Sequence, residues 1–85
     1  MTLQQLEYFV SAAHNLNFSK TAEMFFVSQS AITQQIRSLE KELKLDLFIR
    51  KNNRISLTDS GQVFMREAEQ ILAKVSDSIE RVHSV

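Results

Sequence analysis

Apolar residues between positions 28 and 43 recur at the spacing of one helix face. Four aliphatic side chains follow one another at intervals of three or four residues: Ile32, Ile36, Leu39 and Leu43. This period predicts an amphipathic helix whose apolar stripe packs against a core. Ser28 stands directly before the periodic run, where its hydroxyl can accept from free backbone N–H groups of the first turn. The sequence therefore predicts a helix over residues 28–43.

A second apolar stripe predicts a helix over about residues 3–13. Thr2 followed by Gln5 is a capping-box signature at its start. Asn15 and Asn17 are expected to end this helix, because asparagine tolerates the left-handed conformation found at helix ends.

A short helix is predicted between these two. Ser19 can cap its first turn, and its inward-facing residues run to about Phe25. Phe18, just before it, is expected to fill the core. Phe26 lies in a tight turn that leads into the helix at 28–43. Two helices joined in this way make a helix-turn-helix.

Two β-compatible runs follow, at residues 47–51 and 54–57, and Asn52 and Asn53 separate them. Two asparagines suit a two-residue turn with positive φ, so the runs predict a hairpin. Successive side chains of the second run point to opposite faces. Ile55 and Leu57 are expected to face the core, and Arg54 and Ser56 are expected to face solvent. The hairpin is either a plain surface hairpin with solvated charges or, beside a helix-turn-helix, a basic wing.

The remaining residues predict one long helix that begins after Thr58. Its apolar residues alternate between spacings of four and three, which is the pattern of a coiled-coil seam. The seam consists of Phe64, Ala68, Ile71, Val75, Ser78 and Val82. Part of it, near Phe64 and Met65, can pack on the chain's own domain. Ile71, Val75 and the residues after them lie too far along the helix for that, so dimerisation through Phe64, Ala68, Ile71, Val75 and Val82 is predicted.

These elements predict a mainly α fold. Residues 1–58 form a winged helix-turn-helix with three helices and a two-stranded β wing, and residues 59–85 form a linker and dimerisation helix. Residues 59–82 span roughly 36 Å at about 1.5 Å per residue. Because no stop signal ends the last helix, the chain is expected to be a fragment of a longer protein.

The polar face of the helix at 28–43 carries hydroxyls, amides and one guanidinium. Its residues are Gln29, Ser30, Thr33, Gln34 and Arg37, and no carboxylate follows before Glu40. Amides can pair with adenine edges, and arginine can pair with guanine edges or phosphate. A solvated helix face usually mixes Lys with Glu instead. The face is therefore either a DNA-reading surface or an ordinary polar surface rich in Ser and Gln.

Charge is unevenly distributed along the chain. The 85 residues have a net charge of zero, but residues 28–58 hold six Lys and Arg against three Asp and Glu, a local charge of +3. Residues 1–27 and 59–85 have net charges of −1 and −2. The positive charge thus coincides with the candidate reading helix and the hairpin, which favours nucleic acid as a partner.

Several function classes are not expected. The chain has no Gly-rich phosphate loop, no paired carboxylates in a plausible cleft and no nucleophile–base pair, so it is not predicted to be an enzyme. It has no cysteine, and His14 and His83 lack ligand-like neighbours, so neither a metal nor a cofactor is predicted. No apolar run approaches membrane-spanning length and no signal peptide opens the chain, so a cytoplasmic protein is expected.

Six sequence motifs, in this order and at this spacing along the chain, together resemble the N-terminal DNA-binding domain of LysR-type transcriptional regulators. They cover nearly the whole chain: 6–9, 18–22, 27–31, 36–43, 47–50 and 57–61. Three positions depart from the family pattern. Ser30 stands where the family often has Pro, Phe26 takes a place that is often polar, and Lys44 stands where Gly usually ends the helix. Either Lys44 is left-handed, or the helix ends differently there.

The resemblance implies sequence-specific binding of double-stranded DNA, with the helix at 28–43 in the major groove and the wing on the backbone or minor groove. The positions that match the family's contacts are Gln29, Ser30, Thr33, Gln34 and Arg37 on the helix and Arg50 and Arg54 at the wing. Arg50 can instead be structural, paired with a carboxylate. The alternative function is a winged-helix module that binds protein and dimerises through a coiled coil, but such a module does not need basic residues around a Gln- and Thr-bearing face. RNA binding is disfavoured, because exposed aromatics on a sheet are missing.

The resemblance also implies a wider assembly. Such regulators are homodimers whose last helices pair antiparallel, or tetramers at full length. They bind partly palindromic, often A·T-containing promoter sites. A C-terminal domain, absent from this chain, binds a small-molecule effector.

Overall fold

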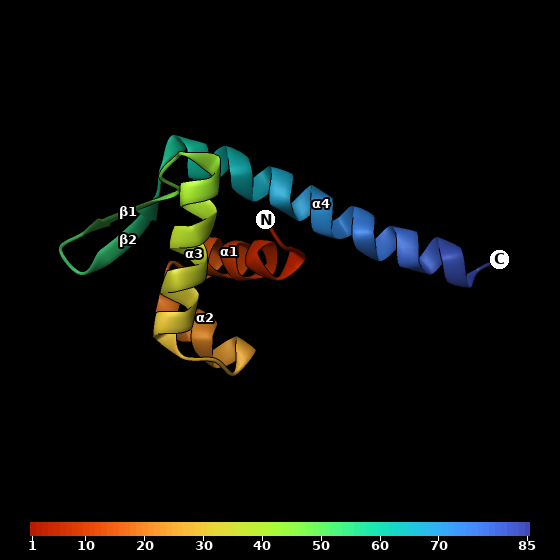
Figure 1. Cartoon of the computed structure of the whole chain (residues 1–85), viewed down its shortest axis with the longest axis horizontal. Coiled ribbons are helices and arrows are strands. Elements are labelled where there is room, and N and C mark those ends of the chain that lie inside the picture. Colours follow the sequence, from red (N-terminus) through yellow and green to blue (C-terminus); the bar gives the residue numbers. More distant parts are fainter.

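The computed structural model describes all residues from 1 to 85, and the protein is mainly helical (Figure 1). Its elements follow in the order α1 (Leu3–Asn15), α2 (Phe18–Phe25), α3 (Gln29–Leu43), β1 (Phe48–Lys51), β2 (Arg54–Leu57) and α4 (Asp59–His83). The first three helices form a body. The β hairpin extends from one side of it, and α4 runs away from it on the other side (Figure 1). The predicted winged helix-turn-helix with a long final helix is confirmed.

Side-chain caps fix the starts of three helices at the predicted residues. Thr2 and Gln5 form the reciprocal capping box of α1, with both side chain–backbone distances at 3.0 Å. The Ser28 hydroxyl accepts from a first-turn N–H of α3 at 3.1 Å, and the Thr58 hydroxyl does the same in α4 at 2.9 Å. Each cap satisfies a backbone donor that has no partner within the helix.

The boundary between α1 and α2 differs from the prediction. α1 continues through Asn15, and Leu16, rather than an asparagine, takes the left-handed conformation, with φ 50°. Ser19 as the cap of α2 was wrong, because the side-chain oxygen of Asn17 accepts from a first-turn N–H at 2.9 Å. Since Asn17 already fills this role, α2 begins at Phe18 and the Ser19 hydroxyl bonds elsewhere.

Helices α2 and α3 also end at residues with positive φ. Phe26 has φ 57° and Lys44 has φ 58°, and the backbone N–H of each bonds carbonyls of the preceding turn. The left-handed alternative for Lys44 therefore holds. This conformation costs a non-glycine residue about 1–2 kcal/mol, which the closing hydrogen bonds help to offset. The side chain of Phe26 is 95% exposed.

The core lies between α1, α3 and the start of the hairpin. Three members of the predicted apolar stripe of α3 are fully buried, and the fourth, Leu43, is half-buried against the core: Ile32, Ile36 and Leu39 have no exposed surface. Phe9 of α1 is also fully buried, and its ring meets that of Phe48 at 5.6 Å between centroids. Phe18 fills the core as predicted, with its ring edge-on to Phe48 at 5.2 Å. This packing holds α3 rigidly, with its polar face outward.

The hairpin is an antiparallel pair in which Phe48 faces Leu57 and Lys51 faces Arg54. Asn52 and Asn53 form the turn with φ 54° and 58°. Both values are positive, which matches the turn that the strands' twist requires. Along β2, exposed and half-buried residues alternate as predicted.

The start of α4 lies directly against the loop before β1. A Cβ atom on Gly61 would lie 2.1 Å from the carbonyl oxygen of Leu47, so glycine is required for this approach. The Thr58 hydroxyl donates to the carbonyl of Asp46 at 2.6 Å. Along α4, packing against the body continues as far as Leu72. The rest of the helix projects, which gives the molecule its longest dimension of 52 Å (Figure 1).

Candidate nucleic-acid interface

The N-terminal half of α3 presents a polar surface. The five residues predicted to read DNA on this helix all lie on it: Gln29, Ser30, Thr33, Gln34 and Arg37. Thr33 is half-buried and the other four are exposed. Because the opposite stripe of α3 is locked in the core, these side chains project from a fixed backbone.

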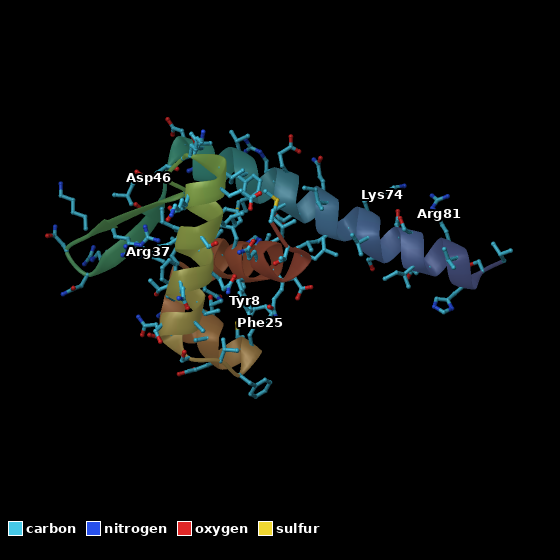
Figure 2. All side chains as sticks on the ribbon, in the orientation of Figure 1. Tyr8, Phe25, Arg37, Asp46, Lys74 and Arg81 are labelled. Atoms are coloured by element: carbon cyan, nitrogen blue, oxygen red, sulfur yellow. The ribbon has the colours of Figure 1, made fainter.

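A groove separates this surface from the wing. Its polar and charged lining residues are Gln29, Thr33, Arg37, Arg50, Lys51, Asn52, Asn53 and Arg54. Figure 2 shows Arg37 on the side of α3 that faces the hairpin. No carboxylate lines the groove. The charged side chains on its lining are therefore all cationic, which suits a polyanion.

Arg50 has a partner within the protein. Glu40 is largely buried on α3, and its carboxylate accepts from the backbone N–H groups of Leu47 and Phe48 at 2.7 and 3.3 Å. Nη2 of Arg50 donates to the other carboxylate oxygen at 3.2 Å. The guanidinium lies 5.5 Å from the centre of the Phe18 ring. The structural role considered for Arg50 is thus present, although its side chain also lines the groove.

Glu40 was not identified as a functional or structural residue from the sequence. Its carboxylate ties the start of the wing to α3, so it sets the position of the wing beside the reading surface. One signal in the sequence could have identified it. Glu40 directly follows Leu39 of the apolar stripe, and a carboxylate that is buried beside a core residue needs hydrogen-bond partners.

A second groove adjoins the first at the start of α2. It is lined by Leu16, Asn17, Phe18, Ser19, Gln29, Asn53, Arg54 and Ile55. Within it, the hydroxyl of Ser19 donates to Oε1 of Gln29 at 2.6 Å. Sequence reasoning missed this contact, because it depends on the angle between α2 and α3 and no local pattern encodes it.

The five residues predicted for dimerisation fall into two groups along α4. Phe64 packs on Phe9 of the same chain with 5.3 Å between ring centroids, and Ala68 has no exposed surface. These two residues therefore belong to the core of the chain itself. Ile71 is 40% exposed, Val75 is half-buried and Val82 is 73% exposed, so these three remain open to a partner.

Neither a membrane-spanning helix nor a cluster of metal-binding side chains is found in the protein. None of the helices is both long and apolar enough to cross a membrane. No three His, Asp or Glu side chains gather in a way that could hold a metal ion.

The sequence is similar to known regulators. A family model described as "Bacterial regulatory helix-turn-helix protein, lysR family" matches residues 3–62. The chain is 44% identical over 77 residues to the "Probable RuBisCO transcriptional regulator" of Phaeodactylum tricornutum, covering 91% of this chain and 25% of that protein. It is 41% identical over 85 residues to "HTH-type transcriptional regulator CitR" of Bacillus subtilis, covering 100% of this chain and 29% of that protein.

The fold is similar to that of a solved protein–DNA complex. The structure described as "Crystal structure of CbnR_DBD-DNA complex" matches with a TM-score of 0.94 and 34% identity, covering 99% of this chain and 97% of that chain. The chain spans only 25% to 29% of the length of the two curated relatives named above.

Proposed function

The chain belongs to the LysR family of bacterial regulatory helix-turn-helix proteins, and from this premise we propose how it binds promoter DNA. It is a regulator's helix-turn-helix domain and not an enzyme. The proposal concerns which residues contact double-stranded DNA, how two copies are joined, and what the whole protein does.

The helix α3 enters the major groove with its polar face toward the bases. Gln29 and Gln34 carry amides, which can donate to and accept from base edges, and Ser30 and Thr33 add hydroxyls. Arg37 reaches guanine edges or phosphate from the side of α3 that faces the wing. The major groove is wide enough to admit an α-helix with such side chains.

The wing lies against the sugar–phosphate backbone or the minor groove. Arg54 is exposed at the start of β2 and lines both grooves beside α3. Arg50 adds positive charge there, but its guanidinium is shared with Glu40, so we assign it a smaller part in DNA contact. Contacts of this kind fix the orientation of the protein on DNA and carry little sequence information.

One observation carries the proposal: a chain with no net charge has a groove lined by four cationic side chains and no carboxylate, directly beside an amide-bearing helix face. A protein-binding winged helix has no need of this arrangement. Phosphate neutralisation supplies much of the affinity for DNA, and the amides of α3 supply base selection.

We further propose that residues 1–58 are the reading domain and that α4 joins two copies. Residues Ile71, Val75 and Val82 form the contact, while Phe64 and Ala68 anchor the helix to its own domain. The 25 residues of α4 span about 37 Å. One turn of B-DNA is about 34–36 Å, so antiparallel pairing of the two helices would suit recognition helices in successive major grooves.

The whole protein is proposed to be longer than this chain. In it, a C-terminal domain binds a small-molecule effector, and the dimers assemble into tetramers on partly palindromic promoter sites. Such a regulator would act in the cytoplasm, where promoter DNA is accessible.

Selection from a random pool of DNA duplexes tests the proposal. The wild-type chain is expected to enrich sequences that contain two related half-sites. Arg37→Glu places a carboxylate in the groove and is expected to abolish enrichment. Arg66→Glu is the matched control, because Arg66 is an exposed arginine of α4 that lines neither groove. If the wild type enriches nothing, the proposal is wrong and the protein-binding alternative is preferred. If the wild type enriches a site and both variants behave like it, the groove beside α3 is not the DNA-binding surface.

A further inference from the structure

The contact between Ser19 and Gln29 joins the second residue of α2 to the first residue of α3. Its length of 2.6 Å is at the short end for a bond between two oxygens. Asn17 already caps α2, so the Ser19 hydroxyl is not needed there and forms no other hydrogen bond within the protein. The side chain of Ser19 therefore acts on Gln29 alone.

The contact fixes which end of the Gln29 amide is available to DNA. Oε1 is turned toward α2 to accept from Ser19, whereas Nε2 has no protein acceptor. A glutamine that reads adenine bidentately presents both atoms to one base edge, with Nε2 donating to N7 and Oε1 accepting from N6. With Oε1 turned toward α2, one of its two lone pairs is taken by Ser19, and the amide is held away from this bidentate pose. Gln29 then presents the two donors of Nε2 instead.

These donors favour one kind of base edge. Guanine shows two adjacent acceptors in the major groove, N7 and O6, whereas adenine places an amino donor beside its N7. Donors on Nε2 match the guanine edge and face an unfavourable donor on adenine. The base preference at the base pair that Gln29 contacts therefore depends on the Ser19 hydroxyl, which itself touches no base.

We propose that Ser19 is a positioning residue that orients the Gln29 amide, so that Gln29 selects guanine over adenine. This inference rests on the proposed function, because Gln29 must face a base edge. A simpler role for Ser19 is direct contact with a phosphate. That role would weaken binding to all sequences alike, since phosphate contacts carry no sequence information.

The experiment compares base preferences from random-duplex selection for the wild type, Gln29→Ala, Ser19→Ala and Ser19→Thr. Gln29→Ala is expected to remove the guanine preference at one position of each half-site. Ser19→Ala is expected to shift that position toward adenine by about 3- to 10-fold, the range of one net hydrogen bond. Ser19→Thr keeps the hydroxyl and is expected to restore the guanine preference.

A base analogue and a control variant sharpen the test. Replacing the selected guanine by 7-deazaguanine removes the N7 acceptor, and it is expected to weaken the wild type but not Gln29→Ala. Ser76→Ala removes an exposed hydroxyl from α4, outside both grooves, and should leave every preference unchanged. Because Ser19 is exposed, circular dichroism should show unchanged folding in Ser19→Ala.

Two failures can be told apart. If no version of the protein enriches any sequence, the proposed function itself fails. If the wild type enriches a site but Ser19→Ala keeps the same preference at every position, or weakens all sequences equally, Ser19 does not position Gln29. The same conclusion follows if Gln29→Ala leaves every position unchanged.

Discussion

At the scale of single residues, base selection and backbone anchoring are assigned to different side chains. Gln34 and Thr33 project from α3, whereas Arg54 projects from the wing. We predict that Gln34→Ala and Thr33→Ala each relax base preference at one or two positions of a half-site, because a good bidentate base contact contributes about 1–3 kcal/mol. Arg54→Ala should weaken binding to all sequences similarly. Titration of each variant against a panel of single-base substitutions measures both effects.

The opposite pattern would overturn these assignments. If Arg54→Ala altered the preferred sequence while Gln34→Ala left it unchanged, α3 would not be the helix that reads bases.

Individual positions differ in how well the sequence predicts them. The caps Thr2 and Ser28 were correctly identified, and so was the start of α4 beside Thr58, because these signals involve only residues a few positions apart. Glu40 and Ser19 were not, since their partners lie seven to ten positions away and are brought near only by the packing of one element on another.

At the scale of elements, the helices and the wing were predictable because each has a clear apolar period and a local start signal. The end of α1 was less predictable. The sequence favours asparagine for the left-handed position, but Leu16 takes it, directly before Asn17, which caps α2. The predicted seam of α4 also combines residues of two kinds, those packed within the chain and those left exposed. Its first two members are held by the chain's own core, and sequence spacing alone does not separate them from the exposed ones.

The junction between the wing and α4 gives a prediction at this scale. Gly61→Ala would place a methyl group against the backbone of Leu47, which cannot move as a flexible side chain would. We expect a loss of about 2 kcal/mol in the free energy of unfolding, within the range for overpacked sites. Urea denaturation followed by circular dichroism measures it. Gln62→Ala, at the exposed neighbouring residue, should change stability by less than about 0.5 kcal/mol. Equal stability of Gly61→Ala and wild type would show that α4 does not need this close approach.

At the scale of the whole molecule, we propose that the projecting half of α4 joins two copies. Figure 2 shows Lys74 and Arg81 on this half of the helix, away from the body. Ile71 lies between the part of α4 that packs on the body and the part that projects. Ile71→Glu would bury a carboxylate in the proposed dimer contact, so we predict a folded monomer that binds a two-half-site duplex weakly.

Sedimentation velocity, circular dichroism and a gel shift measure these three properties. Ala73→Glu is the matched control, because it adds the same charge on the opposite side of α4 from the seam, at an exposed position. If Ile71→Glu stays dimeric and binds like Ala73→Glu, α4 does not form the dimer contact through this residue.

DNA binding through the cationic groove beside α3 is tested most directly by the salt dependence of affinity for a selected two-half-site duplex. A dimer with about four phosphate contacts per protomer should give a slope of roughly −7 for log affinity against log salt concentration. Arg54→Ala removes one contact from each protomer and should make that slope shallower by about 2. A slope near zero, unaltered by Arg54→Ala, would contradict DNA binding by this surface.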